Sequence, residues 1–132
     1  MHYYLAKTEP GTYSIDDLAR DKHTVWDGVT NPQAVKAILA MKKGDKVLFY
    51  HSVTGKEVVG IATVSKSEFP DPTDEKWIAV EIKPVEKFAK PVTLEQIKAE
   101  KSLENIPLIK HSRLSVMPLT NEEFERIIEM SK

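Results

Sequence analysis

A polar string near the start of the chain could carry catalytic chemistry. Lys7, Thr8 and Glu9 follow a short apolar run over residues 3–6 that predicts a buried strand. A lysine amine beside a threonine hydroxyl could form an activated nucleophile, with Glu9 as the proton carrier. Neighbouring positions on a strand point to opposite faces, however, so these three side chains do not converge easily. A polar transition from strand to loop gives the same string without any chemistry, and the residues favour that interpretation.

Trp26 lies between two predicted helices and is followed by Asp27 and Gly28, which predict a turn. An aromatic residue on a loop offers a stacking surface for a nucleobase, and such a stack is worth about 1–3 kcal/mol. The alternative is that Trp26 folds back and plugs one end of the core, which the usual burial of tryptophan favours. The sequence leaves both interpretations open.

Tyr50, His51 and Ser52 end a predicted strand at a rim, where ligand-binding polar groups often lie. Alternation along the strand places His51 on the same face as Val47 and Phe49. A lone histidine in that position is more often a structural residue than a catalyst or a ligand.

Other motifs give little support for a metal or a cofactor. The remaining histidines are scattered, and cysteine is absent from the chain. The sequence has no Gly-rich phosphate loop, no G-x-S-x-G motif and no dinucleotide-binding fingerprint. We therefore expect no metal and no cofactor. Arg113, between Ser112 and Ser115 on a predicted strand, could grip a phosphate or a base edge, and a structural ion pair is equally consistent with it.

The charge balance limits the kind of nucleic-acid partner. The net charge is −1, with 16 lysines but only three arginines. Proteins that grip long duplexes usually carry a basic excess, because they neutralise many phosphates. A nucleic-acid ligand is therefore expected to be held by a few local contacts, most simply one base in a pocket.

Length and composition predict one intracellular, cytoplasmic domain spanning residues 1–132. The chain is 41% apolar and 30% charged, has no apolar run that approaches the roughly 20 residues of a membrane span, and lacks a signal-peptide pattern. Helices are predicted from Ser14 to Arg20, from Asn31 to Gly44, and after the capping boxes at Thr93 and Thr120. Strands are predicted over 3–6, 46–52, 57–65, 77–85 and 113–117, and a stiffened loop over 67–76. Three consecutive strands favour an α+β fold in which a mostly antiparallel meander curls into a barrel with peripheral helices.

Nine sequence strings, taken in order, resemble the EVE domain family of the PUA-like superfamily over nearly the whole chain. They are Lys7-Thr8-Glu9-Pro10, Tyr13-Ser14 with Asp16-Asp17-Leu18, Trp26-Asp27-Gly28-Val29, Asn31 with Gln33-Ala34, Gly44-Asp45 with residues 47–52, residues 59–62, residues 70–73, residues 91–94 and residues 112–116. The resemblance implies a PUA-like barrel and a non-catalytic module that takes a modified base of DNA or RNA into a pocket. The ligand-binding residues that it implies are Lys7, Thr8, Trp26, Asn31, Tyr50, His51, Ser52, Arg113 and Ser115.

Departures from the family pattern narrow the expected ligand. The family often has arginine where this chain has Thr30 and Val35, and tryptophan where it has Tyr4. Fewer cations near the entrance favour a nucleotide or a short single strand over a long nucleic acid. The alternative function is a small amidohydrolase for acylated nucleosides, of the kind found among ASCH relatives, which would use Lys7, Thr8 and Glu9.

Overall fold

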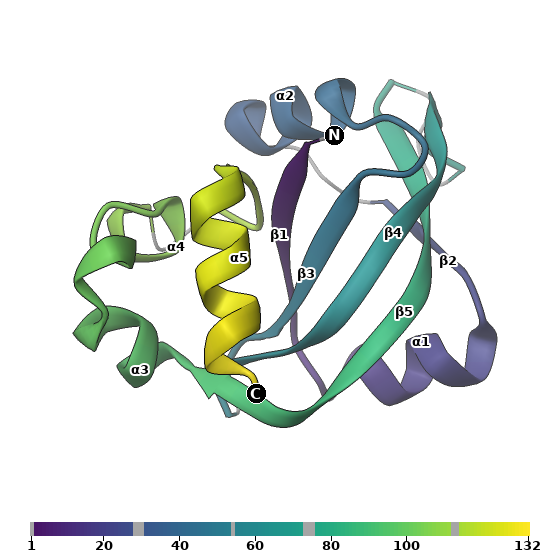
Figure 1. The fold of residues 1–132 in the computed structure, drawn as a ribbon. Helices are drawn as coiled ribbons and strands as arrows, with labels where there is room; N and C mark the ends of the chain where they lie inside the picture. The colour runs from purple at the N-terminus through teal and green to yellow at the C-terminus, as the bar shows by residue number, and fades with distance from the viewer. Residues whose placement is uncertain (1, 28–30, 54, 73–75, 112–113) are drawn as a thin grey trace.

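A computed structural model describes residues 2–27, 31–53, 55–72, 76–111 and 114–132 (Figure 1). The strands are β1 (Tyr3–Thr8), β2 (Thr24–Trp26), β3 (Lys46–His51), β4 (Glu57–Pro70), β5 (Ile78–Thr93) and β6 (Val116–Leu119). The helices are α1 (Ile15–Asp21), α2 (Pro32–Ala40), α3 (Leu94–Ala99), α4 (Pro107–Lys110) and α5 (Asn121–Met130), with a 3₁₀ turn, η1 (Lys101–Leu103), after α3. These elements form an α+β fold, as predicted.

The strands form one six-stranded mixed sheet with the order β2-β5-β4-β3-β1-β6. β1 and β3 are parallel, and the other neighbouring pairs are antiparallel. The predicted closed barrel is wrong. Among the described residues β2 and β6 remain the two edges of the sheet, and α2 packs on both β5 and β6 across the open side. The sheet stays open because, within the described part of the chain, β2 pairs only with β5 and β6 pairs only with β1, while α2 lies between the two edges.

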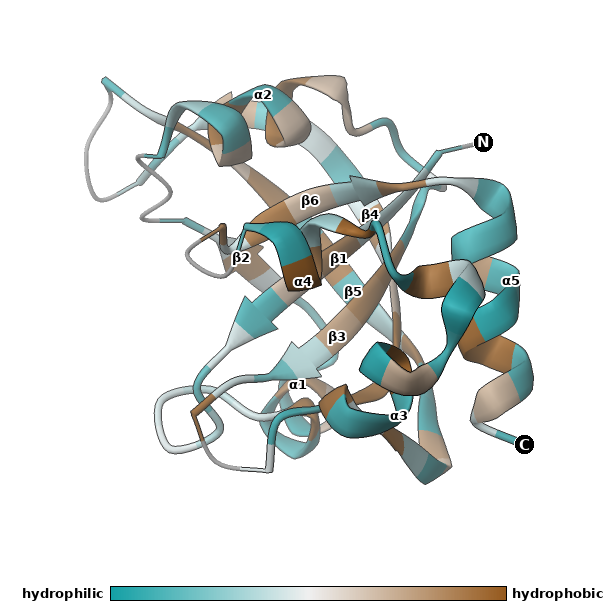
Figure 2. Cartoon of the chain, turned by 90° about the vertical axis from the view of Figure 1, so that its left-hand side faces the viewer, coloured by the Kyte–Doolittle hydropathy of each residue, from teal (hydrophilic) through white to brown (hydrophobic). Residues whose placement is uncertain are grey.

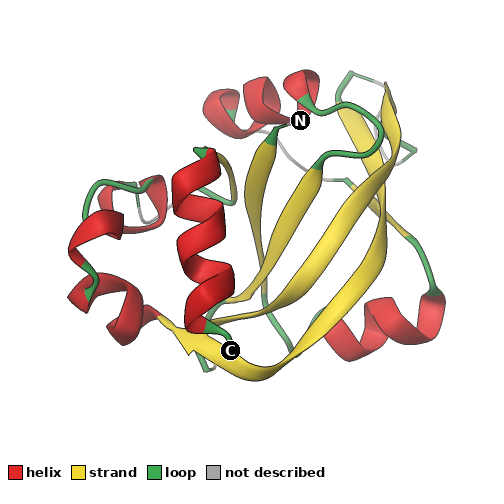
Figure 3. Cartoon of the chain, in the orientation of Figure 1, coloured by secondary structure: helices red, strands yellow, loops and turns green. Residues whose placement is uncertain are grey.

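The hairpin of β4 and β5 is longer than predicted. The two strands run over 14 and 16 residues, and their pairing register shifts at four places. Each shift breaks the period-2 pattern, and so the sequence predicted strand only to residue 65 and loop from residue 67. The bulges also bend the sheet strongly, as Figure 3 shows.

Trp26 lies in a strand and not in the predicted loop. It ends β2, which pairs with β5 so that Trp26 is opposite Val80. Three residues are too few to display an alternating pattern, which explains why β2 was missed. The last strand begins at Val116, after the predicted start at Arg113, which lies outside the described residues.

The predicted helix starts are confirmed by their caps. The side chains of Ser14, Thr93 and Thr120 each accept a hydrogen bond from the backbone three residues later, and each forms a complete capping box. The Asn31 side chain accepts from the N–H groups of Gln33 and Ala34. These caps fix where the helices leave the sheet.

Helices cover both faces of the sheet. α3, α4 and α5 lie together on one side and α1 on the other (Figures 1 and 3). On the first side the ring of Tyr3 stacks on Phe124 of α5 with the ring centroids 4.3 Å apart. Figure 2 shows hydrophobic residues concentrated along the central strands, where Leu5, Leu48 and Phe49 are fully buried. No helix among the described residues is long and apolar enough to cross a membrane.

Candidate functional site

The parallel pair β1 and β3 brings most of the predicted site residues to one edge of the sheet. Lys7 pairs with Tyr50, and Thr8 pairs with His51. Beyond the strands, the Ser52 N–H donates to the Thr8 carbonyl at 2.8 Å. Parallel strands end at the same edge, so the two polar strand ends must lie side by side.

Ser115, the residue before β6, lies at this edge on the other side of β1. The Lys7 N–H donates to the Ser115 carbonyl at 2.8 Å. Since side chains alternate along β1, Lys7 and Thr8 leave the strand on opposite faces. The predicted site residues are consequently divided between two cavities that share Thr8.

The larger cavity, which we call the strand-end cavity, has a volume of about 670 Å³. It is lined by Lys7, Thr8, Glu9, Tyr50, Ser52, Val53, Lys56, Leu94, Leu108, Leu114 and Ser115. The three leucines come from α3, α4 and the segment before β6, and with Val53 they supply the apolar part of the cavity wall. Apolar wall residues combined with polar groups that can orient a ligand are typical of a small-molecule site.

Burial changes the acid–base properties of two residues in the strand-end cavity. It lowers the pKa of the Lys7 ammonium, because a charged group is less well solvated there. It raises the pKa of the Tyr50 phenol for the same reason, and the Tyr50 side chain is only 3% exposed. Tyr50 therefore enters the cavity as a neutral hydroxyl at neutral pH.

The smaller cavity, which we call the Trp26 cavity, has a volume of about 420 Å³. It is lined by Thr8, Thr12, Tyr13, Thr24, Val25, Trp26 and Asp27. Trp26 is half-buried, and its ring meets Phe49 edge to face, with the centroids 5.8 Å apart and an interplanar angle of 81°. The tryptophan thus acts both as a packing residue and as a cavity wall, so the two interpretations from the sequence are not exclusive.

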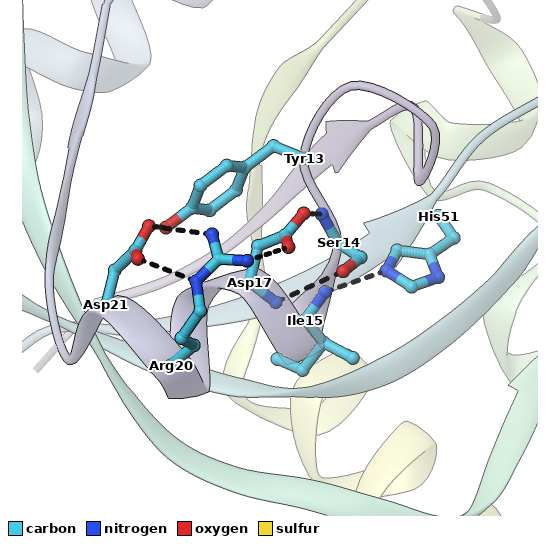
Figure 4. A network of polar contacts seen from close by, with 7 residues as sticks. All are labelled: Tyr13, Ser14, Ile15, Asp17, Arg20, Asp21 and His51. Atoms are coloured by element: carbon cyan, nitrogen blue, oxygen red, sulfur yellow. Dashed lines mark hydrogen bonds and ion pairs between the residues drawn. The ribbon is translucent and has the colours of Figure 1, made fainter.

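Hydrogen bonds fix the loop that covers the Trp26 cavity. The Thr8 hydroxyl donates to the Tyr13 carbonyl at 2.8 Å, and the Tyr13 hydroxyl donates to Asp21 at 2.9 Å. Arg20 pairs with Asp17 and Asp21 at 3.0 Å on the exposed side of α1 (Figure 4). The aromatic ring of Tyr13 is held in place by contacts that need no ligand.

His51 performs a structural task in this network. Its Nε2 atom accepts the Ile15 N–H at 3.0 Å and so holds the first turn of α1 (Figure 4). Its ring lies 6.0 Å from that of Phe49, on the face that the alternation predicted. Burial lowers the pKa of His51, and the nearby Glu57 and Asp16 carboxylates oppose this effect. The neutral imidazole is the form that can accept this bond.

The structure does not gather all the predicted residues into one site. Lys7, Tyr50, Ser52 and Ser115 line the strand-end cavity, Trp26 lines the other, and Thr8 lines both. Asn31 caps α2 and lines neither cavity. Arg113 lies outside the described residues.

Several lining residues could not be found from the sequence. Tyr13 and Leu114 belong to strings that resemble the family but were not named as site residues, and Leu108 carries no motif; only the packing of their elements places them at the cavities. Val53 and Lys56 lie between the strands predicted over 46–52 and 57–65, and nothing in the sequence shows that this connection borders a cavity. The described residues contain no cluster of three histidines, aspartates or glutamates that could hold a metal ion.

Comparison with known proteins identifies the class to which this fold and these cavities belong. The EVE domain model matches residues 2–130, and the chain therefore belongs to the EVE domain family. Thymocyte nuclear protein 1 of Mus musculus is 34% identical over 167 residues, an alignment that covers 99% of this chain and 74% of the relative.

Solved structures are similar over the full length. An NMR structure of a protein from Rhodopseudomonas palustris is 41% identical with a TM-score of 0.95, covering 99% of this chain and 93% of that one. A crystal structure of the human THYN1 protein in complex with DNA containing 5-methylcytosine is 29% identical with a TM-score of 0.91, covering 100% of this chain and 98% of that one.

Proposed function

We propose that this domain is a non-catalytic reader that binds a modified nucleobase of DNA or RNA in the Trp26 cavity. The observation that carries the proposal is the lining of that cavity, in which two aromatic side chains, Trp26 and Tyr13, lie among hydroxyl and carboxylate groups. Aromatic faces stack on bases, and polar side chains read the base edge by hydrogen bonds. The human relative that was solved with 5-methylcytosine DNA supports the same class of ligand.

The polar groups of the Trp26 cavity suit the edge of a cytosine. The Asp27 carboxylate can accept the exocyclic amino group of the base, as acidic side chains do in groove recognition. The methyl groups of Thr12 and Thr24 can contact a methyl substituent at the C5 position. A cavity of about 420 Å³ falls within the range of typical ligand sites. The base is expected to enter in a flipped or single-stranded state, since a stacked base in a duplex could not reach a cavity.

The non-catalytic assignment is supported by the geometry around Thr8. Its hydroxyl donates to the Tyr13 carbonyl at 2.8 Å, so the proton points to the backbone and not to a general base. Lys7 leaves the strand on the other face, and Glu9 is exposed. Although all three residues line the strand-end cavity, the Thr8 hydroxyl is held by the Tyr13 carbonyl and is not positioned as an activated nucleophile.

Two measurements test the proposal. NMR titration should show saturable binding of 5-methyl-2′-deoxycytidine, with shifts at Trp26 and Tyr13, and weaker binding of unmodified deoxycytidine. Incubation with N4-acetylcytidine should leave the nucleoside intact by chromatography. Absence of shifts at the Trp26 cavity with a panel of modified nucleosides would refute the reader, and release of acetate would favour the amidohydrolase.

A further inference from the structure

The strand-end cavity is left without a ligand when the modified base occupies the Trp26 cavity. The two cavities share Thr8 and lie on the two sides of the end of β1. Since Thr8 lines both cavities, the nucleotide joined to a base in the Trp26 cavity would lie near the strand-end cavity. The strand-end cavity is therefore in the path of the same ligand.

The turn between β3 and β4 forms a strained lip of the strand-end cavity. Val53 has a φ angle of +68° and is 66% exposed, although it is an apolar side chain at a cavity edge. A β-branched residue in the left-handed region is a genuine outlier, since its side chain clashes with its own backbone. Asparagine or glycine would fit the turn at lower cost, and strain of this kind is often retained at ligand-binding positions. At Val53 the strained backbone exposes an apolar side chain to solvent at the edge of the strand-end cavity.

Charges at this lip suit one phosphate group. Lys56, at a φ angle of +42°, lines the strand-end cavity together with Lys7, while Glu9 is the only acidic residue among the described residues that line it. Among the described residues the Lys56 ammonium makes no hydrogen bond or ion pair. Lys7 and Lys56 thus bring two basic side chains to the described lining of the cavity, which suits an anionic group such as one phosphodiester.

We infer that the strand-end cavity is a second nucleotide subsite, which takes the nucleotide next to the modified base. Val53 packs against the base of that neighbour, and Leu94 and Leu108 form the opposite wall. Lys7 and Lys56 lie beside the phosphodiester that joins the two nucleotides. This inference rests on the proposed function and adds to it that the recognised unit is a dinucleotide.

The test compares a nucleoside with two dinucleotides. Calorimetry or NMR titration measures the affinity of 5-methyl-2′-deoxycytidine and of deoxydinucleotides that carry 5-methylcytosine in the first or in the second position. In the wild type, one of the two dinucleotides should bind about tenfold more tightly than the nucleoside, from apolar contact and one phosphate.

The variant V53N separates the two subsites. Asparagine tolerates a positive φ angle, so the turn should keep its shape while the apolar lip is lost. V53N should bind the nucleoside as the wild type does and lose most of the dinucleotide gain. V85N is the matched control, because Val85 is 50% exposed and lines neither cavity; the gain should persist in it.

The outcomes distinguish the second subsite from the proposed function. The inference is supported if a dinucleotide binds more tightly than the nucleoside in the wild type and in V85N but not in V53N. Nucleoside binding without a dinucleotide gain, or a gain that V53N retains, overturns the second subsite and leaves the reader intact. Failure of the nucleoside and of both dinucleotides to bind overturns both.

Discussion

Replacement of Trp26 by alanine separates the two roles that the structure gives this side chain. Trp26 is half-buried, meets Phe49 edge to face at 5.8 Å, and lies on a three-residue edge strand. Full truncation of a core tryptophan costs about 3–5 kcal/mol of stability, and we expect W26A to lose about half of that. The protein should therefore remain folded.

In W26A the loss of affinity for the modified nucleoside should be a larger fraction of the binding free energy than the loss of stability is of the unfolding free energy. Removing one stack costs about 1–3 kcal/mol, which corresponds to roughly a 5- to 150-fold weaker binding of the modified nucleoside. Urea unfolding gives the change in stability, and calorimetry on the folded variant gives the affinity per folded molecule. Since the chain has only two tryptophans, fluorescence of a W77F protein would also report directly on ligand contact with Trp26.

W77A provides the control for W26A. Trp77 is also half-buried and lines neither the strand-end cavity nor the Trp26 cavity. It should lose stability and keep its affinity for the nucleoside. A loss of about 4 kcal/mol or more in W26A, with the affinity of the folded fraction unchanged, would show that Trp26 is a core plug and would refute the stacking role.

Three further predictions concern pH, salt and capping. Burial lowers the pKa of His51 in the folded state, so its contribution to stability is complete above the unfolded value near 6.5 and is lost as the pH falls through the folded value. H51Q should flatten this part of the pH–stability curve, measured by urea unfolding at several pH values. Affinity for a short oligonucleotide should fall with salt with a logarithmic slope of at most about 2, and the slope should vanish for the uncharged nucleoside; a steeper slope would indicate an extended basic track. N31A should lose about 1 kcal/mol of stability because it removes the acceptor that caps α2. N31D keeps that acceptor and should keep the stability. If N31D is stable but does not bind the nucleoside, Asn31 has a ligand role beyond capping.

The local elements of this protein could be predicted from the sequence because they depend on neighbouring residues. Ser14, Thr93 and Thr120 mark helix starts through hydrogen bonds that span three positions, and the structure confirms all three. The order of residue types was also sufficient to place the chain in its family, since the nine strings extend over nearly its full length. The strand predicted over residues 46–52 is also confirmed as β3, which ends at His51.

The tertiary structure decided how those residues meet. Alternation along β1 sends Lys7 and Thr8 to different faces. As a result, Lys7 lines only the strand-end cavity, whereas Thr8 lines both cavities. The bulges that lengthen β4 and β5, and the edge strand that carries Trp26, arise from pairing between distant segments. His51 shows the same limit: its bond to the Ile15 N–H joins residues 36 positions apart, and only the packing of α1 against the sheet reveals it. Sequence specifies the side chains that a site can use, and long-range packing determines which of them share a cavity.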